Sequence, residues 1–214
     1  MKTLFVFTIF IFFQIKAEGQ NTVGFKFNIG TSRISSKIYN LPGKQNFPIT
    51  LSGHFGLFHN WRLSSSTILG YEVLFSQIEG KEKYIFQTTS EKTSRQLTYF
   101  AIPFYIGYKF KKFTANLGIQ SNYLLIGKYV KTTKGIDSQG KKYYGSEMGS
   151  LSNIDFYDFG IKSGLISNRS KNMEWEISYY QGINNIYDSE LYSGRWTNFQ
   201  LTCGLRIFPF SKFR

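Results

Sequence analysis

The stretch from Phe104 to Ile119, FYIGYKFKKFTANLGI, alternates between bulky apolar residues and small or polar residues on both sides of a lysine pair, Lys111-Lys112. A period of two predicts β-strands, because successive side chains of a strand point to opposite faces. The lysine pair predicts a tight reversal between two antiparallel strands. The pattern alone leaves open whether the apolar face meets a protein core or lipid. The apolar positions are Phe104, Ile106, Tyr108 and Phe110 before the reversal and Phe113, Ala115, Leu117 and Ile119 after it.

The same alternation recurs along the rest of the chain. At about ten residues or longer, the alternating segments exceed the usual strand of a globular protein and suit a tilted strand that crosses a membrane. A high aromatic content of 19% also favours β structure. The eight predicted strands cover residues 22–31, 49–58, 67–77, 97–110, 113–128, 155–167, 173–180 and 198–207.

The connections between these strands alternate in length. Short connections are expected around residues 59–62, 111–112 and 168–172, and long polar ones around residues 34–48, 78–96, 129–154 and 184–194. An even number of antiparallel strands with short turns at one end and long loops at the other is typical of membrane barrels. The sequence therefore predicts an all-β fold, an eight-stranded antiparallel transmembrane β-barrel with short periplasmic turns and long extracellular loops.

The first residues have the pattern of a secretory signal peptide. Lys2 gives a basic start, residues 4–13 form a short apolar run, and Ala17-Glu18-Gly19 is a small-x-small end. We expect residues 1–19 to be a cleaved signal peptide and residues 20–214 to form one outer-membrane β-barrel domain. The single cysteine, Cys203, excludes an intramolecular disulfide. The expected location is the outer membrane of a bacterial cell.

The polar face of the strands separates a membrane barrel from a soluble, lipocalin-like barrel with the same alternation. A soluble surface carries roughly 25–35% charged residues, whereas this face consists mostly of Gly, Ser, Thr and Asn. Small residues fit the narrow interior of an eight-stranded barrel, so we expect them to point inward. Buried charges must pair, which predicts a plugged interior held by an ion-pair network, with Glu174 or Glu176 near Arg206. Its expected members are Lys26, Lys109, Lys162 and Arg206 with Glu72, Asp158, Glu174 and Glu176.

The formal net charge of +13 indicates an anionic partner. Export argues against nucleic acid and favours outer-membrane lipid and lipopolysaccharide, besides other envelope or secretion proteins. Lysines of the connection 129–154 are candidate contacts to lipid head groups, and the alternative is that they are solvated loop residues. These lysines are Lys128, Lys131, Lys134, Lys141 and Lys142.

Few residues suit catalysis or cofactor binding. His54 and His59 are the two histidines of the chain, and His59 is expected in a short turn. Ser52 shares the inward face with His54, but a serine–histidine site also needs an orienting acid and substrate access. Ligand spacings for zinc or calcium and a phosphate-binding glycine loop are not found. We therefore expect neither catalytic residues nor cofactors.

Three segments resemble the PorT-like outer-membrane β-barrel family. They are YFAIPFYIGYKFKKFTANLGIQSNYLLIGK (99–128), DFGIKSGL (158–165) and EWEISYYQGINNI (174–186). The resemblance implies an outer-membrane location and an eight-stranded barrel, and the member that names the family takes part in assembling a protein-secretion machine.

The expected function is that of a non-enzymatic outer-membrane barrel with a plugged interior, acting in envelope structure or in a secretion or assembly complex. A narrow channel or a carrier of apolar solutes is the first alternative. A lipid-modifying outer-membrane enzyme is the second.

Overall fold

A computed structural model describes residues 21–38, 44–137, 139–151, 157–167, 172–186 and 194–208. The expected signal peptide lies outside the described residues. In the part of the chain that is described, no helix is long and apolar enough to cross a membrane. The strands are β1 (Asn21–Ile38), β2 (Lys44–Asn46), β3 (Thr50–Arg62), β4 (Thr67–Phe86), β5 (Thr89–Phe110), β6 (Phe113–Ile136), β7 (Lys142–Ser150), β8 (Tyr157–Ser167), β9 (Met173–Gly182) and β10 (Gly194–Ile207).

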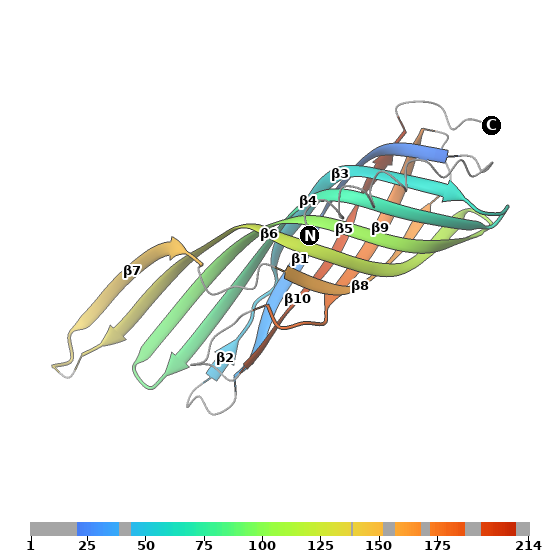
Figure 1. The fold of residues 1–214 in the computed structure, drawn as a ribbon. Coiled ribbons are helices and arrows are strands. Elements are labelled where there is room, and N and C mark those ends of the chain that lie inside the picture. Colours follow the sequence, from blue (N-terminus) through green and yellow to red (C-terminus); the bar gives the residue numbers. More distant parts are fainter. Residues whose placement is uncertain are drawn as a thin grey trace.

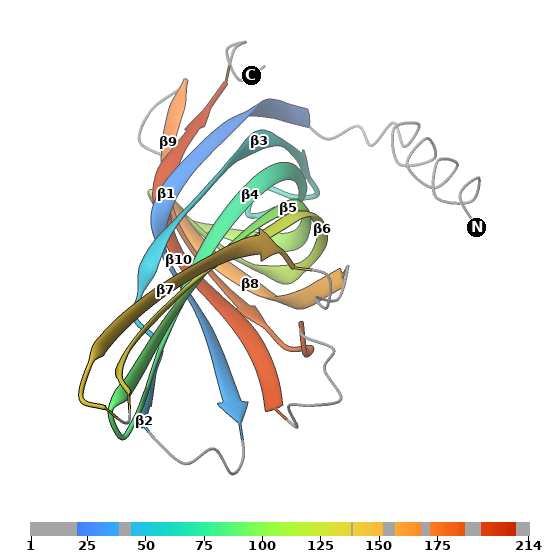
Figure 2. The ribbon, with the colours of Figure 1, turned by 90° about the vertical axis from the view of Figure 1, so that its left-hand side faces the viewer.

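Eight of these strands form a closed antiparallel ring. In ring order they are β1, β3, β4, β5, β6, β8, β9 and β10, and β10 pairs with β1 to close it. Figure 2 shows the ring, with β1 running between β10 and β3. These are the eight strands that the alternation predicts, so the predicted fold class is confirmed.

The two faces of the ring differ as the alternation requires. Apolar side chains point outward and stay accessible, among them Phe27 at 58%, Leu51 at 69% and Leu117 at 59% exposure. A water-soluble monomer rarely exposes so continuous an apolar surface, whereas a membrane barrel presents such a band to lipid. The outward band includes Val23, Phe25, Phe27, Ile29, Leu51, Phe55, Leu57, Phe75, Ile106, Leu117, Ile119, Ile161, Trp175, Ile177, Leu201 and Ile207.

Aromatic side chains cluster near both ends of this band. At the end with the short turns, Trp61 lies 5.3 Å from Tyr71 between ring centroids, and His59 packs 4.3 Å from Trp61. His59 thus lies within β3 and not in the turn where the sequence placed it. Near the other end, the rings of Tyr123 and Tyr157 are 5.4 Å apart. Such aromatic girdles are found where membrane barrels meet the two interfaces.

The short reversal at Lys111-Lys112 is confirmed. Phe110 pairs with Phe113, and Lys111 takes a positive φ of 49°. The β3–β4 turn is tied by the Ser64 hydroxyl, which accepts a hydrogen bond from the Thr67 amide at 3.0 Å.

The prediction of long irregular loops over residues 78–96 and 129–154 is wrong for most of their length. β4 and β5 stay paired as far as Phe86 and Thr89, and β6 pairs with β7 over residues 128–136. These segments carry polar residues on both faces, so the apolar alternation fades although backbone pairing and Thr- and Tyr-rich strands continue.

We call residues 79–86 of β4, 89–96 of β5 and 128–136 of β6, together with β7, the projecting sheet. It extends beyond the ends of β8 and β9 (Figure 1). Strand β6 belongs to both regions, because it pairs with β8 over residues 113–123 and with β7 above that. The short strand β2 pairs with β4 at the other edge.

Candidate functional site

Five charged side chains from five strands meet inside the barrel. The inward parity of each strand places them at one level, where Lys26 is the register partner of Arg206. All five are at most 2% exposed. They are Lys26 on β1, Glu72 on β4, Lys162 on β8, Glu176 on β9 and Arg206 on β10.

Each of the two carboxylates of this ion network faces all three cations. The Lys26 ammonium donates to Glu72 Oε2 at 3.0 Å and to Glu176 Oε1 at 2.6 Å. Lys162 donates to Glu72 and lies 3.9 Å from Glu176. The Arg206 guanidinium lies 3.7 Å from Glu176 Oε2 and 4.0 Å from Glu72 Oε1. The charges therefore cross-link strands on opposite sides of the barrel.

Aromatic and amide groups hold the guanidinium in place. Arg206 Nη2 donates to the Tyr105 hydroxyl at 2.8 Å, and that hydroxyl donates to Asn60 Oδ1 at 2.7 Å. The guanidinium also lies 3.8 Å from the centre of the Phe58 ring, in cation–π contact. Gly70 leaves room for Tyr105, since a Cβ at position 70 would lie 2.5 Å from the Tyr105 ring. Sequence reasoning missed Tyr105 because it lies one strand away from every charge in the list.

Glu174 and Lys109, two further residues of the expected network, lie nearer the turn end. Glu174 is buried and is the register partner of Arg206. It lines a cavity of about 60 Å³ together with Lys109, Arg206 and Phe208. Lys109 itself is exposed and forms no ion pair with the described residues, so its expected place in the buried network is wrong. The reason is its position one residue before the end of β5, where an inward side chain reaches the barrel mouth.

Asp158 is buried but does not join the ion network. Its carboxylate accepts hydrogen bonds from Asn122 Nδ2 and the Tyr180 hydroxyl, both at 2.9 Å, and from Asn198. It sits four residues before Lys162 on β8, farther from the short turns. Amide and hydroxyl donors, which the sequence does not mark as partners, therefore stabilise this charge in place of cations.

Uncharged residues fill the interior on the side of the ion network away from the short turns. Asn28, His54 and Ser76 are neighbours in register on β1, β3 and β4, and all are buried. Beyond them lies an apolar cap in which Leu124 and Leu151 pack against a buried cluster. That cluster consists of Ile34, Ile78, Leu97, Tyr99 and Ile186.

The Ser52 and His54 side chains do not form a catalytic pair. Both are buried, and Ser52 Oγ and His54 Nε2 have no hydrogen-bond partner among the described residues. No group of three or more His, Cys, Asp or Glu side chains in the described ranges is arranged to hold a metal ion.

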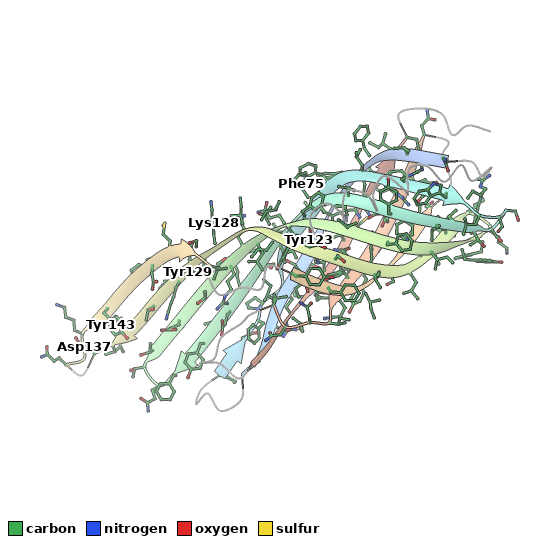
Figure 3. All side chains as sticks on the ribbon, in the orientation of Figure 1. Phe75, Tyr123, Lys128, Tyr129, Asp137 and Tyr143 are labelled. Carbon is green, nitrogen blue, oxygen red and sulfur yellow. The ribbon has the colours of Figure 1, made fainter. Side chains whose placement is uncertain are left out.

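The five candidate head-group lysines separate onto different parts of the projecting sheet. Lys131 forms an ion pair with Glu91 at 3.1 Å. Lys128, Lys134 and Lys142 share the opposite face, and Lys141 lies in the β6–β7 turn, where its amide donates to Asp137. In Figure 3, Lys128 and Phe75 project from the same side of the sheet, and Tyr129 projects from the other.

Three solved structures resemble this fold at low identity, and no curated protein sequence matches the chain. The attachment invasion locus protein Ail of Yersinia pestis is 12% identical, with a TM-score of 0.40, covering 87% of this chain and 99% of that chain. The outer membrane protein OprG of Pseudomonas aeruginosa is 9% identical, with a TM-score of 0.38 and coverages of 88% and 95%. The outer membrane protease OmpT of Escherichia coli is 11% identical, with a TM-score of 0.38 and coverages of 88% and 95%.

The sequence also matches a family model, described as an outer membrane protein beta-barrel domain, over residues 7–188. This match covers most of the eight-stranded ring and agrees with its apolar exterior and polar, charged interior. The chain therefore belongs to the outer membrane protein beta-barrel domain family and is a protein of the bacterial outer membrane.

Proposed function

We propose that the protein is a non-enzymatic, non-conducting barrel that acts through the surface it presents beyond the membrane. In this role it is a structural element of the envelope or a PorT-like component of a secretion or assembly complex. The observation that carries the proposal is the filled interior, in which a buried ion network is followed by an apolar cap.

The ion network opposes passage of a solute through the barrel. A solute would have to separate Lys26 and Lys162 from Glu72, at side chains with 0–2% exposure. Leaving one buried charge without its partner costs about 3–5 kcal/mol. The apolar cap would impose a second barrier to ions, because its residues offer no polar groups to replace water.

The absence of a contact between Ser52 and His54 supports a non-enzymatic role. Acyl transfer by serine requires a base within hydrogen-bond reach, and Ser52 Oγ has no hydrogen-bond partner among the residues described. Lipid A mass spectra from cells with and without the gene test the enzymatic alternative. We expect identical spectra, and a modification that disappears with the gene would establish the enzyme.

Planar-bilayer conductance tests the closed interior. We expect the purified full-length chain to give no stable current steps in a membrane where a porin, added as a positive control, conducts. Reproducible single-channel steps would instead support the narrow channel.

Co-purification from the native envelope tests the proposed assembly role. The residues to change are Tyr144 and Met148 of β7, which are 67% and 78% exposed. We expect a protein partner that is lost with Tyr144→Ser/Met148→Ser and retained with the matched barrel-surface variant Phe25→Leu. A partner set unaffected by the β7 changes would remove the projecting sheet from the proposed role.

A further inference from the structure

The projecting sheet distributes its charges unevenly between its two faces. Side chains on one face continue the inward side of the barrel, and side chains on the other face continue the lipid-facing side, because alternation is unbroken along β4. We call these the inner face and the outer face. Glu79 and Lys81 lie on the outer face two and three positions beyond Phe75 in the outward series, and Glu82 lies on the inner face.

The inner face neutralises its own charges. Arg95 pairs with Glu82 at 2.9 Å, and Lys131 pairs with Glu91 at 3.1 Å. The third carboxylate, Glu147, accepts a hydrogen bond of 2.5 Å from the Tyr129 hydroxyl. This bond to a carboxylate raises the pKa of Tyr129. The inner face therefore needs no external counter-charge.

The outer face carries six lysines and a single carboxylate, Glu79, within β4 to β7. Lys81 pairs with Glu79 at 2.9 Å. Burial alone would raise the pKa of Glu79, but hydrogen bonds from Lys81 and Ser94, with the charges of Lys81 and Lys92, lower it. The other five lysines form no ion pair with the described residues. They are Lys83, Lys92, Lys128, Lys134 and Lys142.

A hollow of about 550 Å³ lies where the outer face meets the lipid-facing band. Its lining combines the Lys128 side chain with apolar Val130 and Met148, and with polar Ser94 and Gln96. Two exposed apolar residues, Leu125 and Ile126, at 50% and 52% exposure, come just before Lys128 on β6. The boundary thus offers an apolar surface and a cation side by side.

We propose that the outer face of the projecting sheet binds a phosphorylated glycolipid of the adjacent membrane leaflet, with Lys128 and Lys92 contacting its phosphates. A lipid fits better than a soluble polyanion because the lysines continue the lipid-facing side of the barrel and border its apolar band. Acyl chains would pack on the exposed apolar residues below the lysines. Each lysine near an anionic membrane surface contributes about 1 kcal/mol to such binding.

Two charge-matched double variants test this proposal. Lys92→Gln/Lys128→Gln removes two cations from the outer face, one on β5 and one on β6. Arg95→Gln/Lys131→Gln removes two cations from the inner face, three residues farther along the same two strands. The full-length proteins in detergent are titrated with lipid A that carries both phosphates, and bound lipid is counted by native mass spectrometry.

We expect the outer-face variant to bind lipid A about thirtyfold more weakly, equivalent to about 2 kcal/mol, and the inner-face variant to match the original protein within twofold. Equal losses in the two variants would overturn the proposal. The original protein provides a measurement that needs no variant, because lipid A stripped of its phosphates should bind as weakly as lipid A binds to the outer-face variant. Displacement by millimolar inorganic phosphate, or equally tight binding of dextran sulfate, would show a general anion site and exclude the lipid.

Discussion

Glu72 lies opposite three cations in a space too narrow for water to replace any of them. Its carboxylate accepts hydrogen bonds from Lys26 and Lys162 and lies 4.0 Å from Arg206. Taking such charges out of water is costly, so the arrangement is favourable only when every member is present. The network therefore behaves as one unit, and removing a single member leaves the others without sufficient counter-charge.

Replacing Glu72 with Gln is expected to lower the free energy of unfolding by about 3–5 kcal/mol. The additional change Lys162→Met should recover part of this loss, because it removes one of the cations left without a partner. Urea unfolding in lipid vesicles, followed by tryptophan fluorescence, measures both values. Strictly additive losses in the double variant would contradict a coupled network.

Gly70→Ala tests the packing that supports Arg206. The new Cβ would lie 2.5 Å from the Tyr105 ring, so the ring must move away from Arg206 and Asn60. We expect a loss of about 1–3 kcal/mol in the same unfolding measurement. Gly53→Ala is the matched control, since its nearest neighbour, the Asn28 carbonyl oxygen, is 3.3 Å away. A similar loss at both glycines would count against steric support by position 70.

At this scale the sequence predicts which way a side chain points better than what it meets. Strand parity correctly turns Lys26, Glu72 and Arg206 inward, because a period of two depends only on the backbone. It does not show depth along the barrel, which separates Asp158 from the ion network and puts Lys109 at the mouth. Depth depends on the stagger between strands, and no local pattern reports it.

Among the elements, Pro103 shows how a single residue shapes strand pairing. The sequence predicts a bulge or a gap there, because proline lacks a backbone donor. The β4–β5 ladder is interrupted between the pairs Tyr71–Phe104 and Leu74–Ala101, which confirms the gap. The projecting sheet, in contrast, was expected as loops, since the buried side that makes alternation visible is missing outside the membrane.

Lys111 offers a test of the hairpin that the sequence predicts most directly. Its φ of 49° is unfavourable for a residue with a Cβ. We expect Lys111→Gly to raise the free energy of unfolding by about 0.5–1 kcal/mol, after allowing for the larger entropy of glycine in the unfolded chain. Lys112→Gly, at a position without positive φ, should give no gain. Stabilisation by the second change and not the first would refute this reading of the turn.

The whole molecule can be oriented in its membrane through its own single cysteine. Cys203 is exposed on β10 between the outward residues Leu201 and Leu205. A spin label attached there before reconstitution should collide more often with oxygen, which dissolves in lipid, than with a water-soluble nickel chelate. With Cys203→Ala/Ser146→Cys, which moves the label to β7, the preference should reverse. Preferential access of the nickel chelate to position 203 would mean that the apolar band does not face lipid.

Strand β6 runs from the barrel wall into the projecting sheet while it exchanges β8 for β7 as its partner. β4 and β5 make the same passage and remain paired beside it. A pull on the projecting sheet would thus be carried along three continuous strands and resisted in shear by their hydrogen-bond ladders. Tension applied by a tethered neighbour would tilt the entire barrel before it could peel the sheet away.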